Sequence, residues 1–457
     1  MRTTGGSPWA ALLALVLGFF PIVLDTTTIS VAIPALRTSL HTGLNTVVWI
    51  NSAYLLAFAA PMLFTSRLGD HYGPTRVYLA GLALFTGASL GCGLATGAVM
   101  LIAARAVQGL GSALLTPQTL VLITHLFAPT KRGPAMGVWG ALAGVATVAG
   151  PLLGGVLVDG PGWRWIFLLN VPIDGLALVC TRMLVPDRVA GHPTRLDLIG
   201  VLLSGPGLAL VVLGLQNAQT YGRATATVLL GAGAVLLSLF LLRQRHNRRY
   251  PLLPLEVFAD RNFAAAALTT ATVGFALTGM FVPLFLYLQA VRGLSPTAAG
   301  LLTAPMSLLA AAVSPLAGLW SDRISRRLLV TSGLITFAAG LTTLVAQAGP
   351  TAEPGHLVPA LLVAGLGMGL VFSPLNNLAM STVATQLRSA ASGVFYTTRQ
   401  IGAVLGSASA GALLPAHAGL GGGAVRAGLL VPAAVLLAGT GAIATVRPHQ
   451  TRRRGRR

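Results

Sequence analysis

The segment G-V-W-G-A-L-A-G-V-A-T-V-A-G-P-L-L-G-G-V-L-V-D, residues Gly137 to Asp159, decides the fold of this chain. The run is long enough to cross a lipid bilayer, and its only charge is the final aspartate. Pro151 removes one backbone donor and is expected to bend the helix at that depth. Glycines recur at helical spacing and predict one face that a second helix can approach backbone to backbone. They are Gly137, Gly140, Gly144, Gly150, Gly154 and Gly155.

The whole chain has the composition of a membrane protein. Of its 457 residues, 54% are hydrophobic and only 9% are charged, and the mean hydropathy is +0.78. A soluble protein of this size does not need so much apolar surface, so we expect a polytopic, all-α membrane protein. Cys92 and Cys180 lie in segments predicted to face opposite halves of the bilayer, so no disulfide is expected.

Fourteen apolar runs are long enough to cross roughly 30 Å of hydrocarbon. The connections between them are short, and none can hold a soluble domain. The predicted spans are residues 10–35, 46–66, 77–96, 99–124, 134–158, 165–184, 196–216, 224–243, 263–289, 297–320, 329–348, 357–378, 390–414 and 426–446.

The positions of the basic residues predict how these spans are oriented. With both termini on the cytoplasmic side, 23 of the 30 arginine and lysine residues are cytoplasmic, 5 are outside and 2 are within the membrane. This asymmetry fits the positive-inside rule. The net charge of +20 then indicates contact with anionic lipids of the inner leaflet. Lipid contact, rather than nucleic-acid binding, is also the favoured interpretation of the basic tail, residues 447–457.

The chain repeats internally at an offset of 256 residues. Seven positions in equivalent spans recur, which predicts two six-helix lobes that run in the same direction. We expect an N-terminal lobe at 1–188, an inserted two-helix hairpin and linker at 189–250, a C-terminal lobe at 251–446 and the tail at 447–457. The matched pairs are Arg132 and Arg388, Gly137 and Gly393, Val138 and Val394, Gly150 and Gly406, Gly155 and Gly411, Gly109 and Gly365, and Gly111 and Gly367.

Five motifs together resemble those of the major facilitator superfamily, and of its fourteen-span drug:proton antiporter (EmrB/QacA) type in particular. The resemblance covers nearly the whole chain and implies the major facilitator fold and a monomer. It also implies that Gly144, Gly150-Pro151 and Gly154-Gly155 form the antiporter motif of exporters. The motifs are L-D-T-T-T-I-S-V-A-I-P (Leu24–Pro34), W-I-N-S-A-Y-L-L (Trp49–Leu56), S-R-L-G-D-H-Y-G-P-T-R (Ser66–Arg76), R-A-V-Q-G-L-G (Arg105–Gly111), and the Gly150-Pro151 segment followed by W-R-W-I-F-L-L-N-V-P (Trp163–Pro172).

Four charged residues are predicted to lie well inside the membrane, namely Asp25, Arg105, Asp174 and Arg399. A charge at that depth costs roughly 2.5–3.5 kcal/mol, so such groups face the interior, pair or stay neutral. A carboxyl poised between desolvation and a nearby arginine can take up a proton on one side and lose it on the other. The resemblance assigns proton coupling to Asp25 and Arg105. The alternative is a fixed ion pair that locks spans 1 and 4 together.

Asp174 departs from the resembled motif, in which N-V-P-I is followed by glycine. Three interpretations stay open for it: a second proton site, a contact for a cationic substrate, or a carboxyl reached by water where Pro172 and Gly175 open the helix. Arg399 and Gln400 are predicted to contact substrate or to counter a carboxylate, with a helix-packing pair as the alternative.

Three neutral polar residues are predicted to line a substrate cavity. They are Asn51, Gln108 and Asn170, and they lie on central spans. Hydrogen bonds between helices are an equally good explanation of such residues.

The Ser66–Arg76 loop is predicted to act as a conformational latch. Asp70 follows span 2 with Arg76 nearby, and an aspartate there can accept from arginine and from a helix N-terminus. Ser66 and Pro74-Thr75 depart from the family pattern, so the latch is expected to rely more on the second copy, which includes Asp322, Arg323 and Arg326.

The resulting prediction is a proton-coupled exporter of amphipathic, drug-like small molecules in the cell membrane. A facilitator or a proton symporter on the same scaffold is the alternative, and a membrane-embedded enzyme is a remote one. Because the chain has no nucleotide-binding loop and no metal-ligand spacing, we expect no cofactor and no metal, and energy from a proton gradient.

Overall fold

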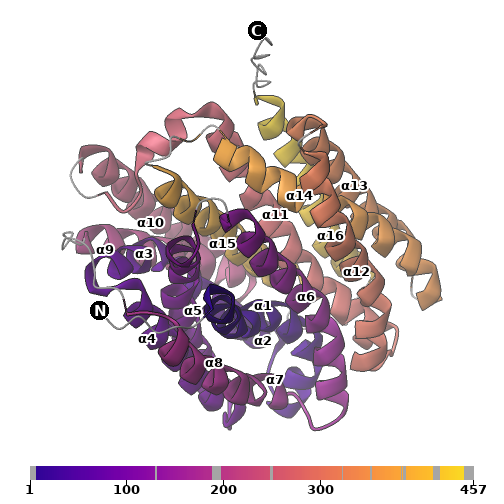
Figure 1. The fold of residues 1–457 in the computed structure, drawn as a ribbon. Coiled ribbons are helices and arrows are strands. Elements are labelled where there is room, and N and C mark those ends of the chain that lie inside the picture. Colours follow the sequence, from indigo (N-terminus) through magenta and orange to yellow (C-terminus); the bar gives the residue numbers. More distant parts are fainter. Residues whose placement is uncertain are drawn as a thin grey trace.

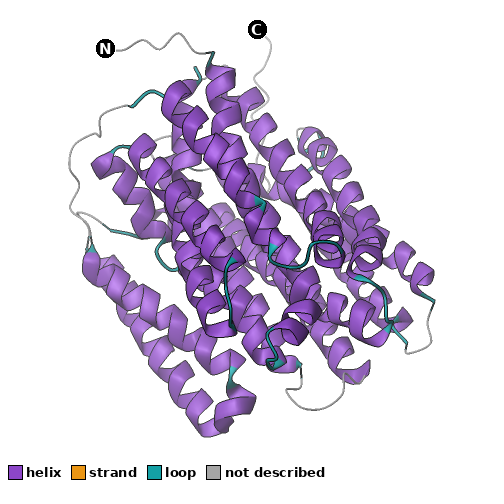
Figure 2. Ribbon diagram, turned by 90° about the horizontal axis from the view of Figure 1, so that it is seen from below, coloured by secondary structure: helices purple, strands orange, loops and turns teal. Residues whose placement is uncertain are grey.

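The computed structural model describes residues 7–128, 131–187, 197–247, 251–321, 323–349, 353–381, 383, 387–414 and 422–446. This part of the chain forms a bundle of helices joined by short loops (Figures 1 and 2). The α-helices are α1 (Pro8–Ser39), α2 (Leu44–Ala59), α3 (Met62–Tyr72), α4 (Pro74–Gly93), α5 (Ala98–Leu126), α6 (Arg132–Asp159), α7 (Trp165–Leu168), α8 (Asn170–Leu184), α9 (Leu198–Gln216), α10 (Ala218–His246), α11 (Arg261–Leu286), α12 (Pro296–Trp320), α13 (Arg326–Gln347), α14 (Val358–Ser381), α15 (Arg388–Leu413) and α16 (Gly422–Ala444), with the short helices η1 (Leu255–Ala259), η2 (Tyr287–Val291) and η3 (Pro354–Leu357).

Each of the predicted spans is helical, but one of them is sharply bent. The second span breaks between α2 and α3, whose axes differ by 45°. Pro61 occupies this break, where its missing N–H and its ring prevent a continuous helix. The sixth span, formed by α7 and α8, continues through Leu169, whose backbone angles are helical.

Eleven helices in the described part of the chain are long and apolar enough to cross a membrane, and the bent pair α2–α3 makes a twelfth. The third and thirteenth predicted spans correspond to α4 and α15, which fall outside this set. In α15 the cause is visible, because Arg399, Gln400 and several serines and threonines dilute its apolar residues. The total of fourteen spans therefore stays a prediction.

Two large apolar cores lie in the two halves of the chain, which occupy different sides of Figure 1. One core is built from residues between Val257 and Val446, joined by Val31 of α1. The other is built from residues between Ala11 and Val212, joined by two residues of α15. Helices α1 and α15 therefore each reach into the core of the opposite half.

Helix α6 packs between the two halves, against α1 on one side and α12 on the other. Side chains added at Gly150 and Gly154 would meet Thr27 and Thr28 of α1, respectively. At Gly155 an added Cβ would lie 2.6 Å from the carbonyl oxygen of Pro296, at the start of α12. The prediction of a single glycine face is therefore wrong, because neighbouring helical residues point about 100° apart and here face different helices.

The other glycines of α6 do not share this close packing. Gly137 and Gly140 have no atom within 4 Å of the position of an added Cβ. The surroundings of Gly144 lie outside the described residues. The tight packing is thus confined to the C-terminal half of α6, where Asp159 Oδ2 also accepts a 2.8 Å hydrogen bond from the Thr297 backbone N–H.

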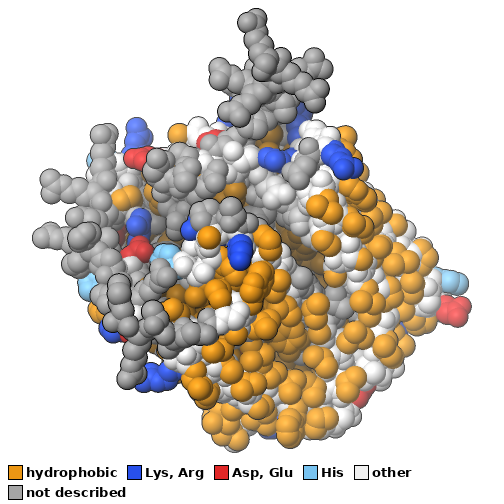
Figure 3. Space-filling model, viewed as in Figure 1, with side chains coloured by type: hydrophobic (Ala, Val, Ile, Leu, Met, Phe, Trp, Pro, Cys, Tyr) orange, Lys and Arg blue, Asp and Glu red, His pale blue; other side chains and the backbone are white. Residues whose placement is uncertain are grey.

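The outer surface of the bundle is apolar. Orange side chains cover most of the lower and right-hand part of Figure 3, whereas arginine and lysine gather toward its upper and left margins. On α12, for example, Leu301, Leu308 and Leu319 are all more than half exposed. A continuous apolar surface of this kind fits contact with lipid rather than with water.

Candidate functional site

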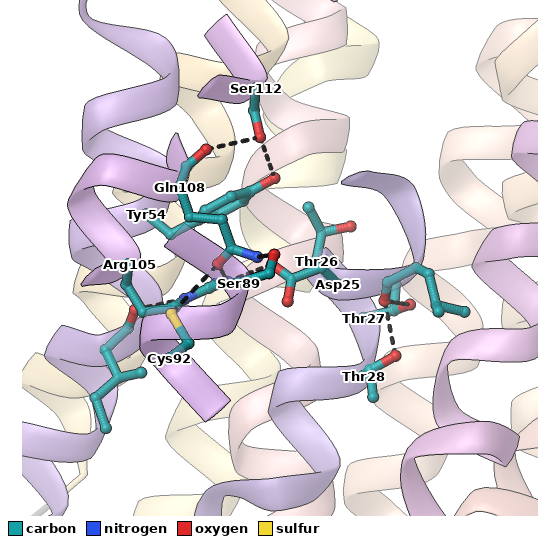
Figure 4. A network of polar contacts seen from close by, with 12 residues as sticks. Asp25, Thr26, Thr27, Thr28, Tyr54, Ser89, Cys92, Arg105, Gln108 and Ser112 are labelled. Carbon is teal, nitrogen blue, oxygen red and sulfur yellow. Dashed lines mark hydrogen bonds and ion pairs between the residues drawn. The ribbon is translucent and has the colours of Figure 1, made fainter. Parts of the chain in front are cut away.

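A buried ion pair between α1 and α5 is the centre of the site (Figure 4). Asp25 and Arg105 are 1% and 0% exposed, and Arg105 Nη1 donates to Asp25 Oδ2. The same guanidinium donates from Nη1 to Gln108 Oε1 at 2.7 Å and from Nε to the carbonyl oxygen of Ile50 at 3.1 Å. The two residues expected to couple protons are therefore in direct contact, deep in the first half of the chain.

The threonines that follow Asp25 are satisfied within α1. Thr26 and Thr27 donate to the carbonyl oxygens of Val23 and Leu24 at 2.7 and 3.0 Å. Thr28 donates to Leu24 O at 2.8 Å and lies 3.2 Å from the carbonyl oxygen of Gly150 in α6. Their hydroxyls are thus hydrogen-bonded to backbone carbonyl oxygens. The ionisable group of this motif is the Asp25 carboxyl.

A wider polar network supports the guanidinium. Gln108 Nε2 donates to Ser89 Oγ at 2.8 Å, which ties α5 to α4. The Arg105 guanidinium carbon lies 4.0 Å from the centre of the Tyr54 ring. The Tyr54 hydroxyl is in turn 2.9 Å from Ser112 Oγ (Figure 4). Three helices therefore hold one arginine in place.

The ion pair is not fully satisfied. Asp25 Oδ1 and Arg105 Nη2 are buried and have no hydrogen-bond partner in the described part of the chain. A buried ion pair adds little net stability, whereas leaving one of its charges alone costs about 3–5 kcal/mol. The geometry therefore leaves both interpretations open, a group that changes its protonation state and a fixed ion pair between α1 and α5.

The predicted residues of α8 lie apart from that pair. Asp174 and Asn170 are 0% and 1% exposed, and both side chains lack hydrogen-bond partners among the described residues. Asp174 is therefore not exposed on the surface of this conformation, and its three interpretations stay open. The helices that pack most closely on α8 are α1, α4 and α7, all in the first half.

The other predicted cavity residues lie between the two halves or near that boundary. Asn51 of α2 donates to Ser407 Oγ of α15 at 3.1 Å, and Ser52 Oγ lies at the same distance from it. Gln108 instead belongs to the network of Arg105. Arg399 lies 5.1 Å from the centre of the Phe372 ring, and no ion pair is formed by it in the described ranges. Gln400 is half-buried beside it.

The predicted latch residues are arranged differently from expectation. Asp70 pairs with Arg67 at 3.8 Å, whereas Arg76 pairs with Asp187 at 3.0 Å. The expectation that Arg76 would serve Asp70 is therefore wrong, because the carboxylate that follows α8 is closer to it. In the second copy, Arg323 is exposed and Arg326 begins α13, while Asp322 lies outside the described residues.

The sequence reading missed two groups of residues. Tyr54, Ser89 and Ser112 complete the Arg105 network, and Tyr54 lies in the quoted W-I-N-S-A-Y-L-L motif, three residues after Asn51. The second group centres on the buried Asp197, which caps α9 through the Gly200 N–H at 3.0 Å. Hydropathy does not single out Asp197, because it lies at the end of a predicted span, where charged residues are common.

Asp197 joins three segments of the chain. It accepts hydrogen bonds from Arg243 Nε and Gln244 Nε2 of α10, both at 2.9 Å. Gln244 Oε1 accepts from the Leu253 N–H at 3.2 Å, and Arg67 Nη2 donates to the neighbouring Pro251 carbonyl at 3.2 Å. The α9–α10 pair and the segment before α11 are thereby linked to α3.

No cluster of three or more potential metal ligands is found in the described part of the chain. The polar groups that the structure does bring together are hydrogen-bonded across helices rather than exposed in a cleft. Their arrangement can move a proton or change a helix contact.

Comparison with known proteins identifies the family. The Major Facilitator Superfamily model matches residues 15–407. An uncharacterized MFS-type transporter of Mycobacterium tuberculosis is 46% identical over 418 residues, which cover 90% of this chain and 72% of that protein. The multidrug resistance protein Stp of the same species is 36% identical over 413 residues, covering 89% and 75%. The puromycin resistance protein pur8 of Streptomyces alboniger is 34% identical over 405 residues, covering 88% and 80%.

Solved structures show the same fold at much lower identity. A peptide transporter, POT, in complex with sulfate gives a TM-score of 0.69 at 16% identity, covering 95% of this chain and 94% of that one. A bacterial homologue of the human lysosomal transporter Spinster, in an inward-facing and unoccupied conformation, gives 0.64 at 16% identity, covering 97% and 95%. With a family model that matches most of its length and relatives above 30% identity, this chain belongs to the Major Facilitator Superfamily and is a multi-pass membrane transporter.

Proposed function

We propose that the protein exports amphipathic small molecules, cationic ones among them, in exchange for protons by alternating access. The observation that carries this proposal is the buried and incompletely satisfied ion pair of Asp25 and Arg105. The names of several relatives, which are multidrug and antibiotic resistance or export proteins, support export as the direction of transport.

The ion pair is placed where a change of charge can move a helix between the two halves. A proton on Asp25 removes the negative charge that faces Arg105, and the electrostatic attraction between the two side chains weakens. Asp25 lies on α1, which also contacts α6, α11 and α12. Gln289 Nε2 of η2 donates to the carbonyl oxygen of Val31 on α1 at 2.9 Å. Protonation can therefore bias how α1 sits against the second half, which is the two-state behaviour that coupling requires.

The remaining residues take roles around that switch. Asn51, Arg399 and Gln400 are proposed to line the substrate path together with Gln108. Asn170, which was predicted for the same path, lies instead on the inner face of α8 beside Asp174. Asp70 and Arg76, with Asp322, Arg323 and Arg326, are proposed to bias the conformational equilibrium, Asp70 through Arg67 and Arg76 through Asp187. Pro151 and the glycines around it are proposed to form a hinge and a seal between α1 and α12, with Pro151 as the point of bending.

The proposal includes an arrangement in the cell membrane. The chain crosses the membrane fourteen times, and both termini lie on the cytoplasmic side. Its parts are two six-helix lobes at 1–188 and 251–446, an inserted hairpin at 189–250 and a cytoplasmic tail at 447–457. The monomer contacts anionic lipids through its basic cytoplasmic loops.

The test is a flux assay with purified protein in liposomes that carry an imposed pH gradient. Ethidium, as a lipophilic cation, and puromycin are suitable first probes. An antiporter moves the probe against its own gradient when the proton gradient is present and stops when an uncoupler collapses it. Equilibration that ignores the pH gradient would instead identify a facilitator, and accumulation in the direction of proton flow would identify a symporter.

A further inference from the structure

Helix α8 has the opposite polarity from a water-exposed amphipathic helix. Its outer face is apolar, and Leu176, Val179 and Met183 are 57%, 57% and 68% exposed. Its inner face carries Asn170, Asp174, Ala177 and Thr181, all essentially buried. The polar side chains recur at the spacing of one helical face, so they form a stripe that points into the first half of the chain.

The polar stripe of α8 is defined as Asn170, Asp174 and Thr181, and two of its members, Asn170 and Asp174, lack hydrogen-bond partners in the described part of the chain. Both carboxylate oxygens of Asp174 and both amide atoms of Asn170 are buried and lack hydrogen bonds to other described residues, whereas the buried Thr181 hydroxyl interacts with the hydroxyl of Tyr78. Each such group costs about 1–3 kcal/mol when nothing replaces its hydration. Four unpaired atoms one helical turn apart are therefore best explained by buried water, which needs two to four polar partners at a site.

The groups that face Asp174 come from the helices packed on α8. From α1 the charged group is Asp25, which interacts electrostatically with Asp174. From α4 the titratable group is Tyr78, whose hydroxyl donates to the carbonyl oxygen of Leu15 at 2.8 Å and lies within the field of Asp174. The third neighbour, α7, contributes only Trp165, Ile166, Phe167 and Leu168. Asp174 forms no ion pair within the described ranges.

We infer that Asp174 is a second protonation site, neutral in this conformation, and that the polar stripe of α8 lines a hydrated proton path between α1, α4 and α8 that leads to Asp25. Its role in transport rests on the proposed proton antiport. We place the path in the first half, since the helices that pack most closely on α8 are α1, α4 and α7. A substrate that passes between the two halves would not meet Asp174.

The two carboxyls then have complementary states. Asp25 has an arginine partner and is stable as the carboxylate, whereas Asp174 has none and is stable as the acid. In the transfer step the O–H bond at Asp174 breaks, water carries the proton along the stripe, and an O–H bond forms at Asp25. Arg105 loses its counter-charge, and the Asp174 carboxylate is reprotonated by a hydronium ion that enters the path from the proton-rich side of the membrane and is left as water.

Infrared spectroscopy tests the protonation state without any substrate. Full-length protein in lipid nanodiscs at neutral pH is expected to show a carboxylic acid C=O band that shifts in D2O. The band is expected to be missing from Asp174→Asn and retained in Asp25→Asn and in Glu256→Gln, an exposed control. A wild-type spectrum identical to that of Asp174→Asn in this region would overturn the inference.

Hydrogen–deuterium exchange of the same band tests the path. Asn170→Leu and Thr181→Val are expected to keep the band but slow its exchange by about tenfold. The matched control is Thr86→Val on α4, because its hydroxyl donates to its own helix at Leu82 O and lies outside the stripe. Unchanged exchange in both stripe variants would overturn the hydrated path.

Ethidium flux separates this inference from the proposed function. Asp174→Asn, checked for folding by size exclusion, is expected to lose at least about tenfold of pH-driven flux while substrate-gradient exchange continues. If the flux by wild-type protein does not depend on the pH gradient, the proposed proton antiport is wrong. The infrared measurement still tests the protonation state of Asp174 independently. If wild type responds and Asp174→Asn responds equally, the role of Asp174 in coupling is overturned.

Discussion

Arg105 of α5 and Asp25 of α1 form an ion pair in which neither side chain is exposed. The arginine also contacts the Ile50 carbonyl, Gln108 and the Tyr54 ring, whereas Asp25 has this one ionic partner. The guanidinium is therefore fixed by several neighbours, and the carboxyl is the member of the pair whose state can change.

Removing the arginine should destabilise the protein more than removing both members of the pair. Arg105→Ala leaves Asp25 buried and unpaired, at an expected loss of about 3–5 kcal/mol. The double variant Asp25→Leu/Arg105→Leu should lose less, because no charge is left without a partner. Thermal unfolding in detergent measures both changes. A double variant less stable than Arg105→Ala would show that the ion pair is a structural lock, as the alternative interpretation holds.

Alanine substitutions at two glycines of α6 should have opposite effects. An added Cβ at Gly155 meets the backbone of Pro296 and Thr297, so Gly155→Ala is expected to lower stability by about 1–3 kcal/mol. Gly137→Ala meets no atom within 4 Å and removes a flexible residue from a helix, so a gain of about 0.5–1 kcal/mol is expected. The two melting temperatures, read in the same detergent, check this. Equal shifts in one direction would contradict the close packing of α6 on α12.

Asp197 should stabilise the junction between α9, α10 and the segment before α11. Burial by itself would raise the pKa of Asp197, but the hydrogen bonds from Arg243, Gln244 and the Gly200 N–H outweigh it and lower the pKa below its ordinary value of 3.8. We expect Asp197→Ala to cost about 1.5–3 kcal/mol and to speed amide exchange in the peptide that contains Leu253.

The sign of the pH dependence follows from the lowered pKa of Asp197. Its contribution is complete above the unfolded value and is lost only as pH falls through the lower folded value. The stability difference between wild type and Asp197→Ala should therefore stay constant from neutral pH down to about 4. A difference that already vanishes near pH 6 would contradict the ionised Asp197 cluster. Glu256→Ala, at an exposed position, is the matched control.

Hydropathy located the helices well because the membrane imposes a length and a composition on each span. The pairing of Asp25 with Arg105 could also be predicted from the sequence, because charged side chains in apolar helices are costly unless they pair or become neutral. The fact that Gly154 and Gly155 face different helices follows from helical geometry as well. The helices that they face are α1 and α12, whose contacting residues Thr28 and Pro296 are far from both glycines in the sequence. The hydrophobic periodicity of α6 does not contain that information.

Other features depended on tertiary contacts alone. Arg76 pairs with Asp187, 111 residues away, although Asp70 is nearer in sequence. Asp174 is unpaired because α1 and α4 offer it only Asp25 and Tyr78, a property of its neighbours rather than of its own motif. Pro61 in the sequence indicates that the helix can break there, but it does not predict the 45° angle between α2 and α3.

The most direct test of the central claim is ethidium flux by Asp25→Asn protein in liposomes with an imposed pH gradient. Asparagine keeps the size and a hydrogen-bond acceptor for Arg105 but cannot exchange a proton. The account predicts that uphill, pH-driven flux disappears while ethidium exchange down its own gradient persists, with Glu256→Gln behaving as wild type. Uphill flux at the wild-type rate in Asp25→Asn would contradict the assignment of proton coupling to this residue.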